Sequence, residues 1–243
     1  MEFYSKTDIG KKRKSNQDAV AGQLISPTLA WSVVCDGMGG NNGGDIASNI
    51  AVKEIFKYMN TLLKDKKSSE DIKRLMEYAI ECANKKVYDK SLEDDLLRGM
   101  GTTVVLAVVS DMNLQIFHAG DSRAYVIGKN GIKQISVDHS IVQEMVNSGE
   151  ITAEEARNHI QKNIITRALG VNEEIQLDYN EIPLENEDAV MLCTDGLSNH
   201  LEDQEIYKFF CKYNLNKVPK LLVEECNARG GNDNITVSII KCN

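Results

Sequence analysis

The chain has few of the features that mark specialised classes of protein. Its 243 residues include only 3 prolines, 1 tryptophan and 4 histidines. No Pro-, Gly- or Ser-rich stretch separates two halves, so we expect a single domain over residues 1–243. Hydrophobic residues make up 42% and charged residues 26%, as in ordinary globular proteins. The length is sufficient to bury a large core.

Cysteine spacing and short apolar runs limit where the protein can reside. The 6 cysteines form no C-x-x-C pair, which argues against a zinc site or a disulfide framework. The longest apolar run, "TTVVLAVV", is much shorter than the roughly 18 residues of a membrane span. The start, "MEFYSKTDIG", lacks the apolar core of a signal peptide. We therefore expect a cytoplasmic protein with no membrane partner.

The net charge excludes another class of partner. The formal charge is −8, so most of the surface would repel the phosphates of a nucleic acid. The basic run "KKRK" at Lys11 to Lys14 is a local exception. Such a short run by itself indicates only a solvated patch.

Short runs rich in β-branched residues predict strands, and they occur in consecutive groups. They cover residues 30–35, 102–109, 114–119, 124–128, 132–136, 189–194 and 235–240. Asn130-Gly131 predicts a hairpin between two of them. Helical periodicity begins at Asp45, a candidate N-cap, and at Ser69, and recurs near 202–213 and 216–228. This order favours antiparallel sheets covered by helices, with residues 138–170 as an appended polar, helix-prone segment.

Four glycine-flanked aspartates lie at the ends of apolar runs. They are Asp36 in "VVCDG", Asp121 in "FHAGD", Asp195 in "MLCTDG" and Asp233 in "GGNDN". Asp-Gly usually marks a hairpin, but a loop and a helical pattern follow both Asp36 and Asp195. Carboxylates gathered in a fold repel one another unless a cation compensates them.

The donor types indicate which cation that would be. Oxygen ligands without histidine or cysteine clusters favour Mg²⁺ or Mn²⁺, and Gly37 is small enough to offer its backbone carbonyl. Several aspartates with water suggest a two-metal hydrolytic site. Arg13, five residues before Asp18, could hold an anionic substrate, because a guanidinium matches two phosphate oxygens.

Other phosphate chemistries find no support in the sequence. There is no P-loop, no cysteine followed by arginine at the sixth position, and no G-x-S-x-G elbow. The histidines are isolated along the chain, and we interpret each as a surface or packing residue: His118, His139, His159 and His200.

Taken together, the motifs resemble the metal-dependent protein serine/threonine phosphatases of type 2C, in their compact bacterial form. The resemblance covers nearly the whole chain, in order: "TDIGKKRKSNQDAV", "VVCDGMGG", "GMGTTVVLAVV", "HAGDSRAYVIG", "DHSIVQEMVNSGEITAEEARNHIQKNIITRALG", "LCTDGLSNHL" and "GGNDNITVSII". It implies an α+β fold, a four-layer αββα sandwich in which two antiparallel sheets pack face to face with helices outside. The implied reaction is hydrolysis of phosphoserine and phosphothreonine by water at a pair of Mg²⁺ or Mn²⁺ ions.

The resemblance also implies a role for each site residue. Asp36 would bridge both metals, and Gly37 would be a ligand through its backbone carbonyl. Asp195 and Asp233 would be the remaining acidic ligands of the first metal. Asp121 corresponds to a ligand of a third, weaker ion. Arg13 corresponds to the phosphate-binding arginine, and Asp18 to an acid that orients metal-bound water. Residues 138–168 correspond to a mobile flap that handles substrate.

Three positions depart from the family's pattern. Gln17 stands where many members have glutamate, so the second metal is expected to bind less tightly. Met38 and Asn41 stand where animal and bacterial members, respectively, often have histidine. Protonation of the leaving group by histidine is therefore unsupported, and a metal-bound water could do it instead.

Three functions are compared on this basis. The intact acid set fits an active phosphatase of phosphoproteins. We expect such an enzyme to act as a monomer and to oppose a serine/threonine kinase. The alternative is a catalytically silent phosphoprotein-binding module of the same fold. A third reading, a phosphohydrolase of small molecules or nucleic acid, is disfavoured for nucleic acid by the charge.

Overall fold

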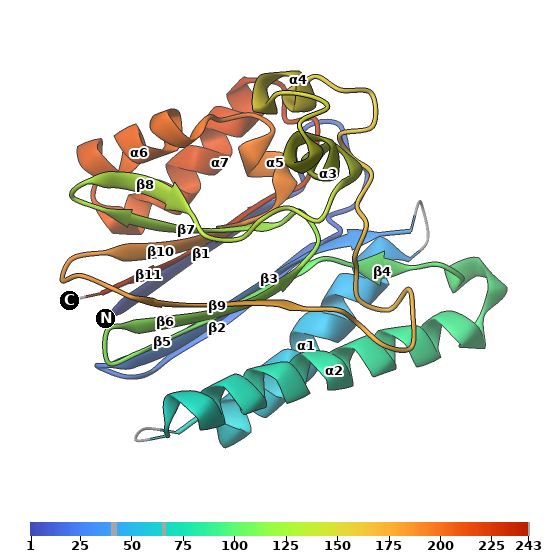
Figure 1. Cartoon of the computed structure of the whole chain (residues 1–243), viewed down its shortest axis with the longest axis horizontal. Coiled ribbons are helices and arrows are strands. Elements are labelled where there is room, and N and C mark those ends of the chain that lie inside the picture. Colours follow the sequence, from blue (N-terminus) through green and yellow to red (C-terminus); the bar gives the residue numbers. More distant parts are fainter. Residues whose placement is uncertain (40–42, 65–66, 243) are drawn as a thin grey trace.

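Two antiparallel sheets lie face to face at the centre of the molecule (Figure 1). The computed structural model describes residues 1–39, 43–64 and 67–242. The first sheet has the order β1 (Glu2–Asp8), β11 (Ile235–Lys241), β10 (Ala189–Cys193), β7 (Arg123–Gly128), β8 (Gly131–Gln134). The second has the order β2 (Asp18–Ser26), β3 (Leu29–Met38), β5 (Val104–Ser110), β6 (Asn113–Ala119), β9 (Asp178–Pro183). The short β4 (Gly101–Thr102) pairs with the end of β3.

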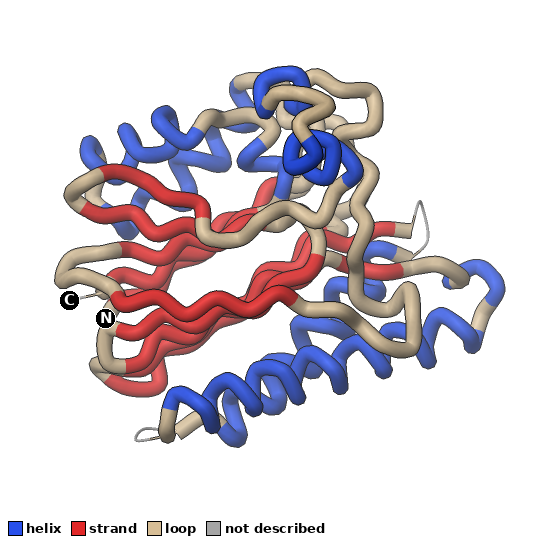
Figure 2. Tube along the Cα trace, viewed as in Figure 1, coloured by secondary structure: helices blue, strands red, loops and turns tan. Residues whose placement is uncertain are grey.

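Helices cover both outer faces (Figure 2). The second sheet is covered by α1 (Gly44–Leu62) and α2 (Ser69–Glu93), and the first by α5 (Asp195–Ser198), α6 (Asp203–Lys212) and α7 (Val218–Ala228). Two further helices, α3 (Ile141–Ser148) and α4 (Ala153–Arg157), lie at one end, and the 3-10 turns are η2 (Asp95–Leu97) and η3 (Leu215–Lys217). The predicted αββα sandwich is confirmed.

The four layers explain why some strands are apolar without alternation. In β5, Val104, Leu106 and Val108 pack in the core beneath α1 and α2. The residues between them, Val105, Ala107 and Val109, pack in the core between the sheets. Because side chains alternate along a strand, a strand buried on both faces reads as one continuous apolar run. A third core lies between the first sheet and α6 and α7.

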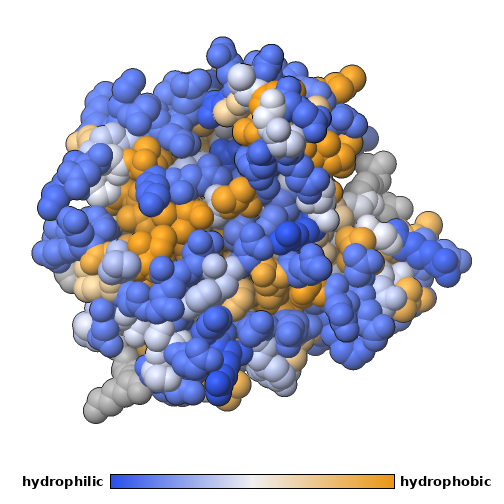
Figure 3. All heavy atoms as spheres, in the orientation of Figure 1, coloured by the Kyte–Doolittle hydropathy of each residue, from blue (hydrophilic) through white to orange (hydrophobic). Residues whose placement is uncertain are grey.

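Some large apolar side chains also reach the outer surface, among them Leu96 and Ile160. The face in Figure 3 is mostly hydrophilic, and its apolar atoms gather in separate areas. Among the described helices, none is both long enough and apolar enough to cross a membrane.

Three strands were missed by the sequence prediction: β1, β2 and β9. All three are edge strands, and their residues are largely half-buried or exposed rather than enclosed. Without burial on both faces they lack the apolar run that identified the other strands. The predicted run 102–109 is also divided at Thr103: β4 pairs with the end of β3 and bridges to Leu169, whereas β5 pairs with β3 and β6.

Two helix starts differ from the prediction. Asp45 is not the N-cap of α1: the helix begins at Gly44 with Gly43 at the cap, and Asp45 lies in its first turn. A Cβ on Gly44 would lie 2.6 Å from the carbonyl oxygen of Gly37, so the backbones approach there too closely for a side chain. The helix after β10 begins at Asp195 itself, without the expected loop.

Asn84 of α2 fixes the loop that follows the appended segment. Its side chain is 1% exposed. Its amide donates to the carbonyls of Asn172 and Glu173 at 3.1 and 2.8 Å, and its oxygen accepts from the amide of Gly170 at 2.7 Å. One side chain thus satisfies three backbone groups.

We predict that Asn84→Ala lowers the free energy of unfolding by about 1–3 kcal/mol, because buried backbone groups lose their partners. Urea denaturation of the metal-free protein measures this. The control is Asn49→Ala, since Asn49 is exposed and bonds only to the carbonyl of Asp45 in its own helix. Equal losses in both variants would contradict the anchoring role of Asn84.

Candidate metal centre

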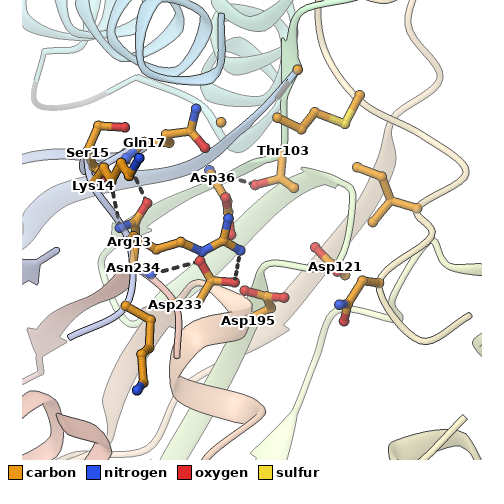
Figure 4. Close-up of a pocket in the computed structure, with 16 residues that line it drawn as sticks. Arg13, Lys14, Ser15, Gln17, Asp36, Thr103, Asp121, Asp195, Asp233 and Asn234 are labelled. Carbon is orange, nitrogen blue, oxygen red and sulfur yellow. Dashed lines mark hydrogen bonds and ion pairs between the residues drawn. The ribbon is translucent and has the colours of Figure 1, made fainter. Parts of the chain in front are cut away.

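The four aspartates meet at one end of the space between the sheets. Asp36 lies near the end of β3, Asp195 follows β10, and Asp233 precedes β11. Asp121 lies in the turn where the chain passes from β6 in one sheet to β7 in the other. All four line one cavity of about 470 Å³, together with Arg13 and Gly37 (Figure 4). The structure therefore brings together six of the seven predicted site residues.

Backbone contacts hold Asp36 in place. Its carbonyl accepts from the amide of Thr103 at 2.8 Å and from the hydroxyl of Thr102 at 2.9 Å. Its amide donates to Oγ1 of Thr103 at 2.9 Å, and Thr103 is bonded to Ser122. The backbone is therefore fixed while the carboxylate faces the cavity.

Gly37 occupies a space that only glycine fits. A Cβ there would lie 1.9 Å from the carbonyl oxygen of Gly44 and 2.7 Å from that of Gln17. The Gly37 amide donates to the Gln17 carbonyl at 3.0 Å. The backbone of Gly37 is thereby exposed to the cavity that it lines.

Asp18 is the seventh predicted residue, and it lies buried behind the cavity. It is directly opposite Asp36 in the β2–β3 pairing, an arrangement that places like charges on the same face of the sheet. Its Oδ2 accepts from the hydroxyls of Thr194 and Thr236 at 2.9 and 2.7 Å. Thr236 lies in β11 of the first sheet and Thr194 directly follows β10, so Asp18 connects the two sheets.

Arg13 contacts the acid set directly. Its Nη2 donates to Oδ2 of Asp233 at 2.7 Å, and this bond is the main cause that raises the pKa of Arg13. The guanidinium remains about half exposed and retains other N–H groups. These groups are available to an anion in the cavity.

Asn234 positions the loop that carries Arg13, and sequence reasoning missed it. Its amide donates to the carbonyls of Ile9 and Ser15 at 2.9 and 3.0 Å, and its oxygen accepts from the Gln17 amide at 2.8 Å. The Asn next to Asp233 in "GGNDN" was the available signal. The sequence analysis also missed three threonines at the site, Thr103, Thr194 and Thr236. Their hydroxyl groups bond to residues that are distant in sequence, and the sequence alone does not identify such partners.

Burial and mutual repulsion raise the pKa of four acids at this site: Asp18, Asp36, Asp121 and Asp195. Burial is the largest cause for each, and it raises the pKa of Asp18 to about 7 and that of Asp195 to about 6. The pKa of Asp36 lies well above its ordinary value because of burial, followed by repulsion from Asp18, Asp195, Asp121 and Asp233. Burial and then Asp195 raise the pKa of Asp121. In the absence of a cation, protons compensate part of this charge.

The unpartnered oxygens fit a divalent metal. Oδ1 of Asp18 and Oδ1 of Asp195 are buried and have no hydrogen-bond partner among the residues that the structure describes. Buried polar atoms are normally satisfied, so these two indicate a partner that is a cation or its water. The donors lining the cavity are carboxylate, carbonyl and amide oxygens, which suit Mg²⁺ or Mn²⁺.

A second group of ligand-type side chains does not fit a metal. The rings of His118 and His139 stack at 4.7 Å with an angle of 3° between their planes, and both lie close to Asp178. Parallel rings cannot both direct in-plane lone pairs at one ion. His118 Nε2 already bonds to the Val137 carbonyl, and His139 contacts the Gly120 amide and Asp178. The two histidines, isolated in sequence, are adjacent in space and act in packing.

The appended segment lies beside the cavity. It is closed at its base by the Ser140–Ile165 bridge, and it contributes Asn163 and Ile165 to the cavity lining. A partly buried ion pair between Arg123 of β7 and Asp138, with nitrogen–oxygen distances of 2.7 to 3.0 Å, holds its start. That this segment acts as a mobile flap stays a prediction.

Comparison with known proteins shows the family. The family model described as protein phosphatase 2C matches residues 10–220. The serine/threonine phosphatase stp of Listeria monocytogenes is 34% identical over 245 residues, covering 99% of this chain and 96% of that protein. The protein phosphatase PhpP of Streptococcus pneumoniae is 35% identical over 245 residues, covering 100% of this chain and 98% of that protein. The chain therefore belongs to the protein phosphatase 2C family, the metal-dependent protein serine/threonine phosphatases.

Solved structures agree in fold. The serine/threonine phosphatase Stp1 from Staphylococcus aureus superposes with a TM-score of 0.93 at 31% identity, covering 100% of this chain and 95% of that one. The catalytic domain of the serine/threonine protein phosphatase PstP, solved with 2 manganese ions, superposes with a TM-score of 0.86 at 27% identity. The match covers 100% of this chain and 98% of that one. The expected class of enzyme and its dependence on a divalent metal are confirmed.

The three departures from the family pattern have different outcomes. Met38 and Gln17 both line the cavity. The weaker binding of a second metal beside Gln17 stays a prediction. Asn41 lies outside the described residues.

We predict that metal stabilises the protein more at neutral than at acidic pH. Acids with raised pKa bind protons in the folded state that the unfolded state lacks, so the metal-free fold loses stability as pH rises from about 4 to about 7. A metal must displace those protons, so its contribution grows over the same range. Thermal unfolding with Mn²⁺ and with EDTA, at about pH 5.5 and about pH 7.5, measures the metal-induced shift. Equal shifts at both pH values, or a shift that persists in Asp36→Asn, would contradict this.

Proposed function

We propose that this chain hydrolyses phosphoserine and phosphothreonine in proteins at a binuclear Mg²⁺ or Mn²⁺ centre. The observation that supports this most is the convergence of Asp36, Asp195 and Asp233 with Arg13 on one cavity. Asp36 would bridge the two ions, and Asp195, Asp233 and the Gly37 carbonyl would complete their protein ligands. Asp121, beside Asp195, would hold a third, weaker ion.

Divalent ions held there supply a water nucleophile at neutral pH and neutralise the charge of the phosphate. No cysteine thiol lines the cavity among the described residues, and the Thr103 hydroxyl, which does, is bonded to Ser122. Cys35 precedes Asp36, but it is fully buried and burial raises the pKa of its thiol. Direct attack by water, without a covalent enzyme intermediate, is therefore the route that these residues support.

Arg13 and Asp18 have supporting roles in this proposal. Arg13 would bind two phosphate oxygens through N–H groups other than the one engaged by Asp233. Asp18, with Oδ2 held by two threonines, would use its free Oδ1 to orient water on the metal. No histidine lines the cavity among the described residues, so we assign protonation of the leaving group to water.

Further parts of the proposal concern the cell and the assembly. We infer a single domain with residues 138–168 as a mobile flap, acting as a monomer against a serine/threonine kinase. A reducing cytoplasm is consistent with the free state of the six cysteines. The silent binding module is disfavoured, because none of the aspartates expected to hold metal is replaced.

The test measures hydrolysis of a phosphoserine peptide with Mn²⁺. We predict turnover that EDTA abolishes and that added Mn²⁺ restores. Asp36→Asn should lower kcat by about a thousandfold or more, since it removes the group shared by both ions. Arg13→Ala should mainly raise KM, by about one to two decades, because a charge-assisted bond is worth about 1.5–3 kcal/mol.

Arg13→Lys is the matched control, since it keeps the charge but not the planar fork. Its KM should lie between those of wild type and Arg13→Ala. Turnover that resists EDTA, or phosphopeptide binding without turnover in metal-saturated protein, would refute the proposed function.

A further inference from the structure

A second depression lies next to the metal cavity and shares a wall with it. It encloses about 400 Å³ and runs between the end of β3, the base of the flap and the loop before β9. Met38 and Ile165 line both this groove and the metal cavity. A chain bound with its phosphate at the aspartates can therefore extend into the groove without leaving the surface.

The groove has an apolar part beside polar residues. Its apolar lining comes from Met38, Ile165, Ala168, Val171 and Ile175, and its charged lining residues are Arg167, which is bonded to Asp178, and Glu174. A Cβ built on Gly101 would lie 2.9 Å from Cγ2 of Val171 and 3.1 Å from Cε of Met38, so these two side chains meet above Gly101. Val171 is 40% exposed although it is a large apolar residue, and Ile175 lines the same groove. Methionine adapts its shape to different apolar partners.

The groove is fixed relative to the reaction centre. Asn84 holds the loop that carries Val171, through Gly170, Asn172 and Glu173. Leu169 exchanges backbone hydrogen bonds of 3.0 and 2.8 Å with Thr102, whose hydroxyl donates to the Asp36 carbonyl. A side chain in this groove would thus be held in register with the phosphate.

The opposite side of the metal cavity differs in chemistry. Lys12, Arg13 and Lys14 line the metal cavity, and Figure 4 shows Arg13 and Lys14 to one side of Asp195, with Asp121 to the other. Basic side chains suit phosphate and acidic groups, whereas Met38, Val171 and Ile175 give the groove an apolar part. The site is therefore asymmetric along the path of a bound peptide.

We propose that the groove is a subsite of the phosphoprotein substrate, and that it binds one apolar side chain within about three residues of the phosphorylated residue, given about 3.3–3.6 Å of extended chain per residue. This inference rests on the proposed function. The occupant is a segment of the substrate, because the groove is continuous with the cavity where the phosphate reacts.

Phosphoserine peptides in an alanine-rich background test this, with a single leucine moved through the three positions on either side. The value of kcat/KM for each peptide is divided by that for p-nitrophenyl phosphate, which has no flanking chain. We expect leucine to raise this ratio about tenfold at one or two positions on one side of the phosphoserine. Val171→Asp should abolish the preference.

Leu96→Asp is the matched control, because Leu96 is an exposed leucine outside the groove, and it should keep the preference. No preference at any position in wild type, or a preference that survives Val171→Asp, would overturn the proposal while hydrolysis of p-nitrophenyl phosphate continues. Sedimentation of the wild type and of Val171→Asp adds a further outcome. If the wild type is a dimer and Val171→Asp is a monomer, the groove binds a second copy of this chain, and the proposal is overturned as well. Failure of the proposed function is distinct, since no substrate would then be hydrolysed.

Discussion

Repulsion among the carboxylates at one end of the sandwich is the constraint on which the rest of the site depends. Asp36 carries a raised pKa because it is buried and faces Asp18, Asp195, Asp121 and Asp233. A fold can hold these groups together only if a cation or protons compensate their charge. Affinity for metal, sensitivity to pH and attraction for phosphate through Arg13 all follow from this arrangement.

The antiparallel topology makes this arrangement possible. Strands and turns that are distant in sequence reach the same end of the space between the sheets, and each delivers one acid there. Residues that are not ligands then fix the geometry: Thr103 holds Asp36, Thr194 and Thr236 hold Asp18, and Asn234 holds the loop of Arg13. The reaction centre thus rests on contacts between the two sheets and on rigid strands.

The sequence predicted the parts of this protein whose signals are local. Strands buried on both faces, such as β5, were recognisable as apolar runs, and Asp-Gly before a helix identified Asp36 as more than a turn. Edge strands such as β1 were missed, because half-exposed residues carry no such run. The stacking of His118 on His139 and the groove at Val171 depend on segments that only the folded chain brings together.

The most direct test of this account is a crystal structure of the protein with Mn²⁺, using the anomalous signal of the metal. We predict two manganese peaks in the aspartate cavity, both within coordination distance of the Asp36 carboxylate, at about 2.0–2.2 Å. Manganese held instead by His118, His139 and Asp178, or no manganese at Asp36, would contradict the central claim.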